Sequence, residues 1–305
     1  MENLLDAVGR HTDAHSQANG VAASAIPGLT TVRATMPSPL LHAIPCPLLC
    51  LVLQGSKHVT VGREGTLYAA GDSLLITADA PTISQITGAS RAAPYLALVL
   101  ELDAAVFAAL IDEGAVPGPG LQPRPGLKPG PGLKPGLEPA ATDAELADAA
   151  LRLMHLLDRP ASVPILHTQL VRELHYWLLT GRHGPAVSHF GRQAGPALPI
   201  RRAIARMRTD FAQPLPINEL AVLAAMSRSS FHHHFRKLTS LSPLQFQKRL
   251  RLIEAQRLMR FQDASASSAA FAVGYESVPQ FTRDYSKLFG APPVRDLRAA
   301  RTHHQ

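Results

Sequence analysis

Residues 217–243 read INELAVLAAMSRSSFHHHFRKLTSLSP, and residues 267–293 read SSAAFAVGYESVPQFTRDYSKLFGAPP. The two stretches are near repeats, because fifty residues separate Ser227, Phe231, Phe235, Lys237, Leu238 and Pro243 from Ser277, Phe281, Tyr285, Lys287, Leu288 and Pro293. In each copy an Ala-rich helical segment is followed by a tight break, a Ser and a second helix with aromatic residues at i and i+4. This pattern predicts two helix-turn-helix units in tandem. Since the second helix of such a unit can enter the major groove, the pattern also indicates sequence-specific DNA binding.

The first candidate recognition helix covers residues 228–238. Its apolar residues are Phe231, Phe235 and Leu238. They recur at helical spacing and therefore lie on one face of the helix, which we expect to point inward. Polar residues then occupy the outward face or its margins, where they can reach DNA. The candidate DNA-binding residues of this helix are Ser229, His232, His233 and Arg236.

The second candidate recognition helix follows Ser277. We expect Ser277 to cap it, with Gln280 as the capping-box partner, and Pro279 to lie in the first turn, where its missing N–H is harmless. Its candidate DNA-binding residues are Gln280, Arg283 and Lys287. Arg suits guanine and Gln suits adenine, and each good pair contributes about 1–3 kcal/mol of discrimination.

The stretch between the units, SPLQFQKRLRLIEAQRLMRF at residues 242–261, has uninterrupted helical character with basic residues between its apolar contacts. A long helix here would hold the two recognition helices at a fixed separation, so that one chain could address two successive major-groove segments. The alternative is a basic surface helix in an unrelated bundle.

Charge is divided unevenly along the 305-residue chain. Residues 196–305 carry 17 Lys and Arg against 7 Asp and Glu, whereas residues 1–195 carry 13 against 16. A basic region beside a mildly acidic one fits phosphate contacts confined to the former. No long apolar run and no signal peptide is visible, which predicts a cytoplasmic protein without a membrane segment.

Residues 37–101 contain six short β-type runs, LLCLVLQ, KHVTV, TLYA, SLLIT, TISQIT and YLALVLEL, which predict a small barrel or sandwich. Residues 1–27 are polar without a clear period, and we expect them to be poorly ordered. Residues 114–139 are rich in Pro and Gly and predict a linker or a loop insertion. Two helices should follow, starting near Thr142 and Val163. The apolar stripe of the second must be buried, either on the barrel alone or also in a dimer interface. A polar stretch with Gly and Pro, residues 181–199, is expected to separate the two halves.

The segment from PINELAVLAAM to VRDLR, with its GYES-x-x-x-F and FG-x-P-P motif, resembles the DNA-binding domain of AraC/XylS-type transcriptional regulators. LLCLVLQGSKHVTVGREGTLYAAGDSLLIT and PYLALVLELD resemble the cupin-like sensor domain of one AraC subfamily. The resemblance implies a regulator, with activation among its expected roles, that binds double-stranded DNA, an unknown small-molecule effector and RNA polymerase. It implies an α+β fold with a cupin-like sensor barrel at residues 28–113, accessory helices at 140–195 and a double helix-turn-helix domain at 196–305. Two departures are that His233 stands where the family often has Arg, and Ala225 where a turn Gly is frequent.

Catalytic alternatives have little support in the sequence. A metal-binding cupin needs clustered His and Glu, but this region offers only the isolated His42 and His58. Three consecutive histidines on a helix diverge by about 100° each, unlike the i, i+4 pairs of helical metal sites. Cys46 and Cys50 are two core residues or, less simply, a redox switch. We therefore expect no enzyme, cofactor or metal. A cupin-type enzyme with a basic targeting domain and a constitutive DNA-binding protein with a structural barrel remain the competing hypotheses.

Overall fold

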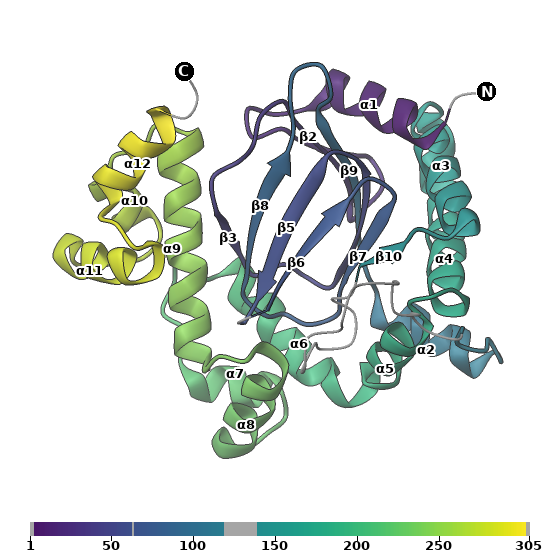
Figure 1. Ribbon diagram of the computed structural model, residues 1–305. Coiled ribbons are helices and arrows are strands. Elements are labelled where there is room, and N and C mark those ends of the chain that lie inside the picture. The colour runs from purple at the N-terminus through teal and green to yellow at the C-terminus, as the bar shows by residue number, and fades with distance from the viewer. Residues whose placement is uncertain (1–2, 63, 119–138, 303–305) are drawn as a thin grey trace. The chain divides into compact units, whose positions relative to one another are not determined.

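The chain forms two compact units, and the predicted two-domain α+β fold class is confirmed (Figure 1). The computed structural model describes residues 3–62, 64–118 and 139–302, so most of the predicted Pro/Gly-rich segment at 114–139 lies outside the described residues. Unit 1 comprises Met1–Leu41 and Pro45–Gly195, and unit 2 comprises His42–Ile44 and Pro196–Gln305. Within the described ranges, no helix has the length and apolar character needed to cross a membrane.

All six strands expected in residues 37–101 form. They are β4 (Leu48–Gln54), β5 (Ser56–Val61), β6 (Glu64–Ala69), β7 (Asp72–Ile76), β8 (Thr82–Gly88) and β9 (Tyr95–Glu101). Four further strands were not predicted, namely β1 (Val21–Ala23), β2 (Leu29–Ala34), β3 (Leu41–Ala43) and β10 (Ala140–Ala141). The strands make two sheets, in the orders β1-β2-β9-β4-β7-β10 and β3-β8-β5-β6.

The larger sheet buries both of its faces, as its alternating side chains show. On β4, Leu49 and Leu51 join a core shared with the helices of unit 1, whereas Cys50 and Val52 join an interior core shared with the smaller sheet. Successive side chains of a strand point to opposite faces, so an uninterrupted apolar run such as LLCLV can serve two cores at once. The first five residues of β4, LLCLV, are all apolar because the strand is buried on both faces over its central residues 49–52.

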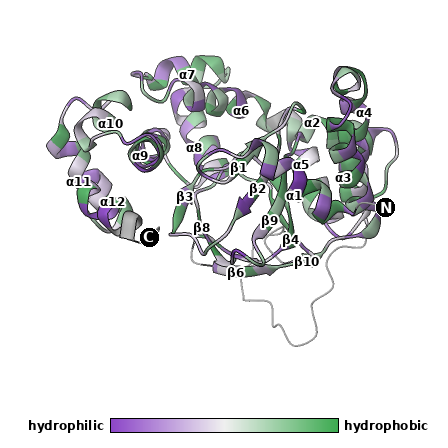
Figure 2. Cartoon of the chain, turned by 90° about the horizontal axis from the view of Figure 1, so that it is seen from above, coloured by the Kyte–Doolittle hydropathy of each residue, from purple (hydrophilic) through white to green (hydrophobic). Residues whose placement is uncertain are grey.

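Helices cover the outer face of the larger sheet (Figure 1). They are α1 (Leu4–His15), α2 (Ala104–Asp112), α3 (Ala144–Leu157), α4 (Val163–Thr180) and α5 (Gly184–Arg192), with a 3₁₀ turn at Pro160–Ser162. Hydrophobic and hydrophilic residues alternate along α3 in Figure 2, as expected for a helix with one buried face. The helices predicted from Thr142 and Val163 correspond to α3 and α4.

One expectation about unit 1 was wrong. The described part of the N-terminal region is not poorly ordered, because the side chain of Asn3 accepts a hydrogen bond from the Asp6 N–H at 3.0 Å and caps α1, and Ala7 and Val8 are fully buried in the helix-covered core. The Gly/Pro-containing stretch at 181–199 contains the boundary between the two units, at Gly195 and Pro196, and it is helical, since it forms α5 and the start of α6. Val187 and Phe190 of α5 are buried in the same core.

Unit 2 consists of helices, apart from the short segment assigned to it from residues 42–44. They are α6 (Ala194–Thr209), α7 (Ile217–Leu223), α8 (Arg228–Thr239), α9 (Pro243–Phe261), α10 (Ala266–Ala272), α11 (Val278–Phe289) and α12 (Pro293–Thr302). The helix pairs α7–α8 and α10–α11 are the two predicted helix-turn-helix units, and α9 is the predicted connecting helix.

Candidate DNA-binding surface

The first candidate recognition helix is α8, and its inward and outward faces are as predicted. The Ser227 side chain accepts a hydrogen bond from the Ser230 N–H and caps the helix, which ends at Ser240 in the left-handed conformation. Phe231 and Phe235 are fully buried, and the Phe235 ring packs edge-on against Phe246 with centroids 5.3 Å apart. The predicted DNA-binding residues of this helix are all exposed, namely Ser229, His232, His233 and Arg236.

The second candidate recognition helix is α11, which has the same length as α8 and begins fifty residues later. Phe281 and Tyr285 are fully buried, at the positions of Phe231 and Phe235 in the first unit. The predicted DNA-binding residues are again exposed, namely Gln280, Arg283 and Lys287. Each unit therefore presents one row of polar side chains opposite a pair of buried aromatic rings.

The predicted capping box at the start of α11 was wrong. Ser277 is the N-cap residue, but its side chain makes no capping hydrogen bond, and its backbone angles are φ −139° and ψ 119°. A capping box forms instead at the start of α9. There Ser242 accepts from the Gln245 N–H at 3.3 Å, and the Gln245 side chain accepts from the Ser242 N–H at 3.0 Å. Gln280 thus keeps its side chain free of this capping role.

Positive charge dominates the polar faces of the two recognition helices. The twelve residues of α8 include no Asp or Glu, and α11 includes one, Asp284. That carboxylate is bound from two sides, by Lys248 Nζ at 3.0–3.1 Å and by the Tyr275 hydroxyl at 3.3 Å. Burial, followed by the nearby Asp284, raises the pKa of Tyr275, so this hydroxyl stays protonated and donates.

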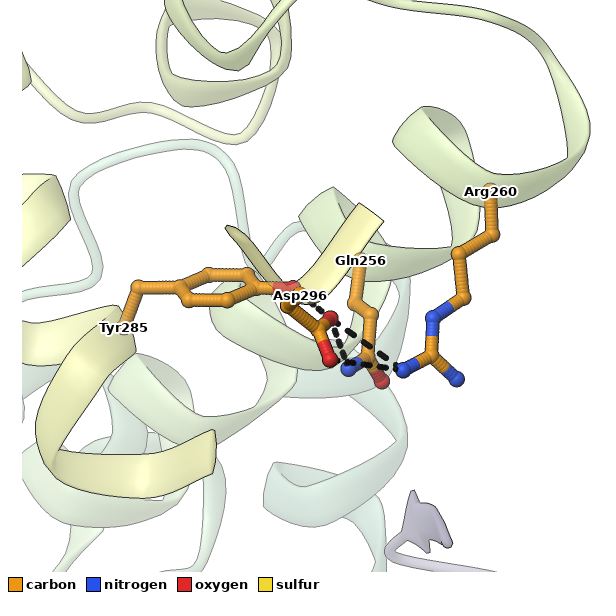
Figure 3. A network of polar contacts seen from close by, with 4 residues as sticks. All are labelled: Gln256, Arg260, Tyr285 and Asp296. Carbon is orange, nitrogen blue, oxygen red and sulfur yellow. Dashed lines mark hydrogen bonds and ion pairs between the residues drawn. The ribbon is translucent and has the colours of Figure 1, made fainter. Parts of the chain in front are cut away.

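A second carboxylate holds the inner face of α11 (Figure 3). Asp296 of α12 accepts hydrogen bonds from the Tyr285 hydroxyl at 2.6 Å, from Gln256 Nε2 at 2.9 Å and from Arg260 Nη2 at 3.0 and 3.1 Å. Burial raises the pKa of Tyr285, and the bond to Asp296 adds to the shift. Three helices, α9, α11 and α12, therefore meet at one carboxylate, which fixes the rotation of the recognition helix.

The connecting helix α9 contributes to the apolar cores of both units. Phe246 is buried in the core around α8, where Leu250 and Ile253 also pack. Leu252, Ala255 and Met259 are buried in the core around α11. The predicted connecting helix is thus part of both hydrophobic cores and not an isolated spacer.

Sequence reasoning missed the groups that hold the recognition helices in place. Lys248 and Arg251 stood out only as basic residues on α9, and Asp284 and Asp296 were not singled out. Their partners lie 9 to 40 residues away along the chain. Helical periodicity carries no information about contacts over such separations.

The interior between the two sheets of unit 1 is apolar, with two buried tyrosines among its side chains. Tyr68 and Tyr95 are almost fully buried, and the Tyr95 hydroxyl lies 4.0 Å from Cys50 Sγ. Burial raises the pKa of both Tyr95 and Cys50, so both groups stay neutral. Cys46 and Cys50 are free thiols. Among the described residues no three His, Cys, Asp or Glu side chains gather as metal ligands would.

Two family models match the chain. The model of the AraC-type transcriptional regulator N-terminus matches residues 25–186, which is more than half of the chain. A helix-turn-helix domain model matches residues 220–299, which include both candidate recognition helices.

Curated relatives match the C-terminal part. GbdR of Pseudomonas aeruginosa, an HTH-type transcriptional regulator, is 33% identical over 99 residues, which are 32% of this chain and 27% of that protein. RhaS of Escherichia fergusonii, an HTH-type transcriptional activator, is 29% identical over 102 residues, 33% of this chain and 36% of RhaS. A putative AraC-like transcription regulator of Streptomyces lividans is 30% identical over 142 residues, 45% of this chain and 46% of that protein. The matches thus span less than half the length of these relatives.

A solved structure extends the fold similarity beyond the C-terminal part of the chain. ToxT of Vibrio cholerae, in a crystal structure with (E)-4-(8-methylnaphthalen-1-yl)but-3-enoic acid, is similar over 88% of this chain and 97% of its own, with a TM-score of 0.55. At 8% sequence identity this likeness concerns the fold alone.

Proposed function

Because the chain belongs to the AraC-type transcriptional regulators, we propose that it reads two successive segments of a DNA major groove with α8 and α11. It is a DNA-binding transcriptional regulator and not an enzyme. The observation that carries the proposal is the pair of twelve-residue helices, each with two buried aromatic rings on one side and exposed polar residues on the other.

Base recognition is assigned to the exposed residues of both helices. In α11, Arg283 suits a bidentate contact with guanine, and Gln280 one with adenine. In α8, the exposed Ser229, His232 and His233 are assigned to base contacts, with His233 at the position that corresponds to Arg283. Arg236 of α8 and Lys287 of α11 are assigned to phosphate contacts. The surplus of positive charge in residues 196–305 supplies the part of the affinity that does not depend on sequence.

Unit 1 is proposed to sense a small molecule. Its match to the AraC-type N-terminus supports a regulatory role, and its two sheets enclose an apolar interior with Tyr68 and Tyr95. An effector that binds there would raise the melting temperature of unit 1. Trp177, the single tryptophan, lies on α4, so its fluorescence reports on this unit. A purely structural barrel would show no shift with any compound of a broad library.

Two further partners complete the proposal. Exposed apolar residues on α4, namely Ile165, Leu166 and Tyr176, favour pairing of two copies through this helix. The second partner is RNA polymerase, which we expect the protein to recruit because the relative RhaS is a transcriptional activator. We expect this to take place in the cytoplasm. Transcription reconstituted from a selected promoter, with and without the protein, distinguishes activation from repression.

The decisive experiment is selection of random and genomic DNA fragments by the purified full chain at two salt concentrations. Two distinct boxes about one helical turn apart are expected, with affinity falling steeply as salt rises. Binding without any motif would show that the basic unit recognises the backbone alone. A motif with a single box would show that one of the two helices does not read bases.

A further inference from the structure

The Arg251 side chain of α9 connects the loop that enters the first helix-turn-helix unit to the turn of the second unit. The Arg251 guanidinium donates from Nε to the Phe211 carbonyl at 2.7 Å, and from Nη2 to the carbonyls of Ala212 and Gln213 at 3.1 and 3.2 Å. Its other terminal nitrogen, Nη1, donates to the Gly274 carbonyl at 2.8 Å. The first three acceptors lie in the loop that enters the first unit, and the fourth lies in the turn of the second unit.

The loop and the turn are also in direct backbone contact. Gly274 has φ +84°, and a Cβ built on it would lie 2.0 Å from the Ala212 carbonyl oxygen. No other residue type fits this approach without displacing the backbone. Arg251 therefore binds two segments that are already in contact, and the distance between the loop and the turn can change very little.

Neighbouring Gln247 supports one side of this junction only. Its Nε2 donates to the carbonyls of Phe211 at 3.0 Å and Gln213 at 2.7 Å, so both of its N–H groups are used by the loop. Of these two side chains, only Arg251 bonds to both the loop and the turn. A guanidinium has five donors in a rigid planar fork, whereas a Lys ammonium is a single point on a flexible stem and cannot reproduce the arrangement.

We propose that Arg251 is a positioning residue for DNA recognition, which fixes the separation of the two recognition helices and thereby the spacing of the DNA boxes that they accept. The proposal rests on the proposed function, since it requires both helices to read DNA. Arg251 also lies close to the candidate reading surface. Arg251 and Gln280, the first candidate base-reading residue of α11, line the same open cavity of about 230 Å³.

The test measures spacing preference rather than affinity alone. The wild-type chain and the Arg251→Lys variant are titrated, by fluorescence anisotropy, with DNA that carries both selected boxes at the selected spacing, with one or two base pairs inserted between them, and with one box only. We expect the wild type to discriminate sharply among the spacings. Arg251→Lys should bind the single box as the wild type does, while its preference for the selected spacing falls by about ten-fold, as hydrogen bonds to a charged group of ordinary strength are lost.

Two matched variants separate positioning from a general loss of stability. Arg257→Lys changes an exposed arginine of the same helix, whose partner is Glu254 of α9 itself, and should keep the wild-type spacing preference. Gln247→Met removes bonds to the loop and leaves the tie to Gly274, so it should also keep the preference. Retention of the full spacing preference by Arg251→Lys would overturn the proposal.

The remaining outcomes are also informative. If Arg251→Lys lost its single-box binding together with its thermal transition, Gly274→Ala would decide. Its Cβ would lie 2.0 Å from the Ala212 carbonyl oxygen and 3.1 Å from Arg251 Nη2, so it pushes the loop and the turn apart in a chain that keeps the arginine. Broadened spacing in that variant supports the proposal, and unchanged spacing overturns it. Failure of the wild type to select two boxes would instead contradict the proposed function and leave the role of Arg251 in DNA reading without a basis.

Discussion

Gly274 and Gly290 have nearly the same backbone conformation, with φ values of +84° and +80°, but different surroundings. A Cβ on Gly274 would collide with the Ala212 carbonyl, whereas nothing lies within 4 Å of a Cβ on Gly290. Gly290→Ala should therefore cost about 1 kcal/mol for the left-handed backbone alone, and Gly274→Ala about 2–4 kcal/mol because the collision adds to it. Urea denaturation followed by circular dichroism measures both. Equal costs would show that the contact with Ala212 has no energetic weight.

The buried imidazole of His183 predicts a pH dependence of unit 1. Its Nε2 lies 2.7 Å from Ser73 Oγ, and Ser73 Oγ donates to the Ala140 carbonyl, so Nε2–H donates to Ser73. Burial lowers the pKa of His183 from 6.5 to about 4. Between these values the unfolded chain binds a proton that the folded chain does not, so stability falls as the pH falls from 6.5 to 4, by up to about 3 kcal/mol.

The measurement is urea denaturation of the full chain at several pH values, followed by Trp177 fluorescence. His183→Gln keeps an N–H donor for Ser73 and removes the titration, so its stability should vary less with pH than that of the wild type. His189→Gln, which changes an exposed histidine of α5, the helix that begins directly after His183, serves as the control. Equal slopes for the wild type and His183→Gln would contradict the assignment.

Residue roles that depend on local spacing could be predicted, and those that depend on distant partners could not. The buried aromatic pairs and the seven exposed candidate DNA-binding residues follow from helical periodicity, which the chain itself encodes. Arg251 and Asp296 act through partners brought near by folding, so their roles became visible only in the structure.

At the scale of elements, the starts of α9 and α11 have the same sequence signature, a Ser followed three residues later by Gln. Only Ser242 with Gln245 forms the capping box, because its backbone angles, φ −71° and ψ 157°, aim the hydroxyl at the helix, and those of Ser277 do not. Ser242→Ala should cost about 1 kcal/mol. Ser277→Ala, the matched control, should cost close to nothing. Hydrogen exchange at the first turns of the two helices resolves the difference, and equal protection losses would contradict it.

Elements with strong periodicity were predictable, while short or atypical ones were not. The six central strands and the paired helices of unit 2 carry long, regular patterns. Strands of two or three residues, such as β1 and β10, are set by pairing with β2 and β7 rather than by their own sequence. Helix α1 was missed because its polar composition concealed three buried residues, Ala7, Val8 and Thr12.

At the scale of the whole molecule, α4 leads to a prediction about assembly. Ile165 is 69% exposed and Leu166 46% exposed on this helix, a costly arrangement unless another surface covers them. If two copies pair here, Ile165→Glu should convert a dimer into a monomer in sedimentation velocity, with loss of the avidity that two linked readers provide on paired operator sites. Leu67→Glu changes an apolar residue of β6 that is 55% exposed and should leave the dimer intact. A wild type that sediments as a monomer at all concentrations would exclude this interface.

The position of α9 in both hydrophobic cores also determines which segments can be exchanged between related regulators. One face of this helix completes the core around α8, and the other completes the core around α11. Neither helix-turn-helix unit can therefore be exchanged without the other. A chimera that joins the first helix-turn-helix unit of this chain to the second unit of a relative would pack one face of the connecting helix against a core from a different protein, to which its side chains are not fitted. A new operator specificity should therefore arise by replacement of exposed side chains on α8 and α11, or by exchange of residues 196–305 as a block.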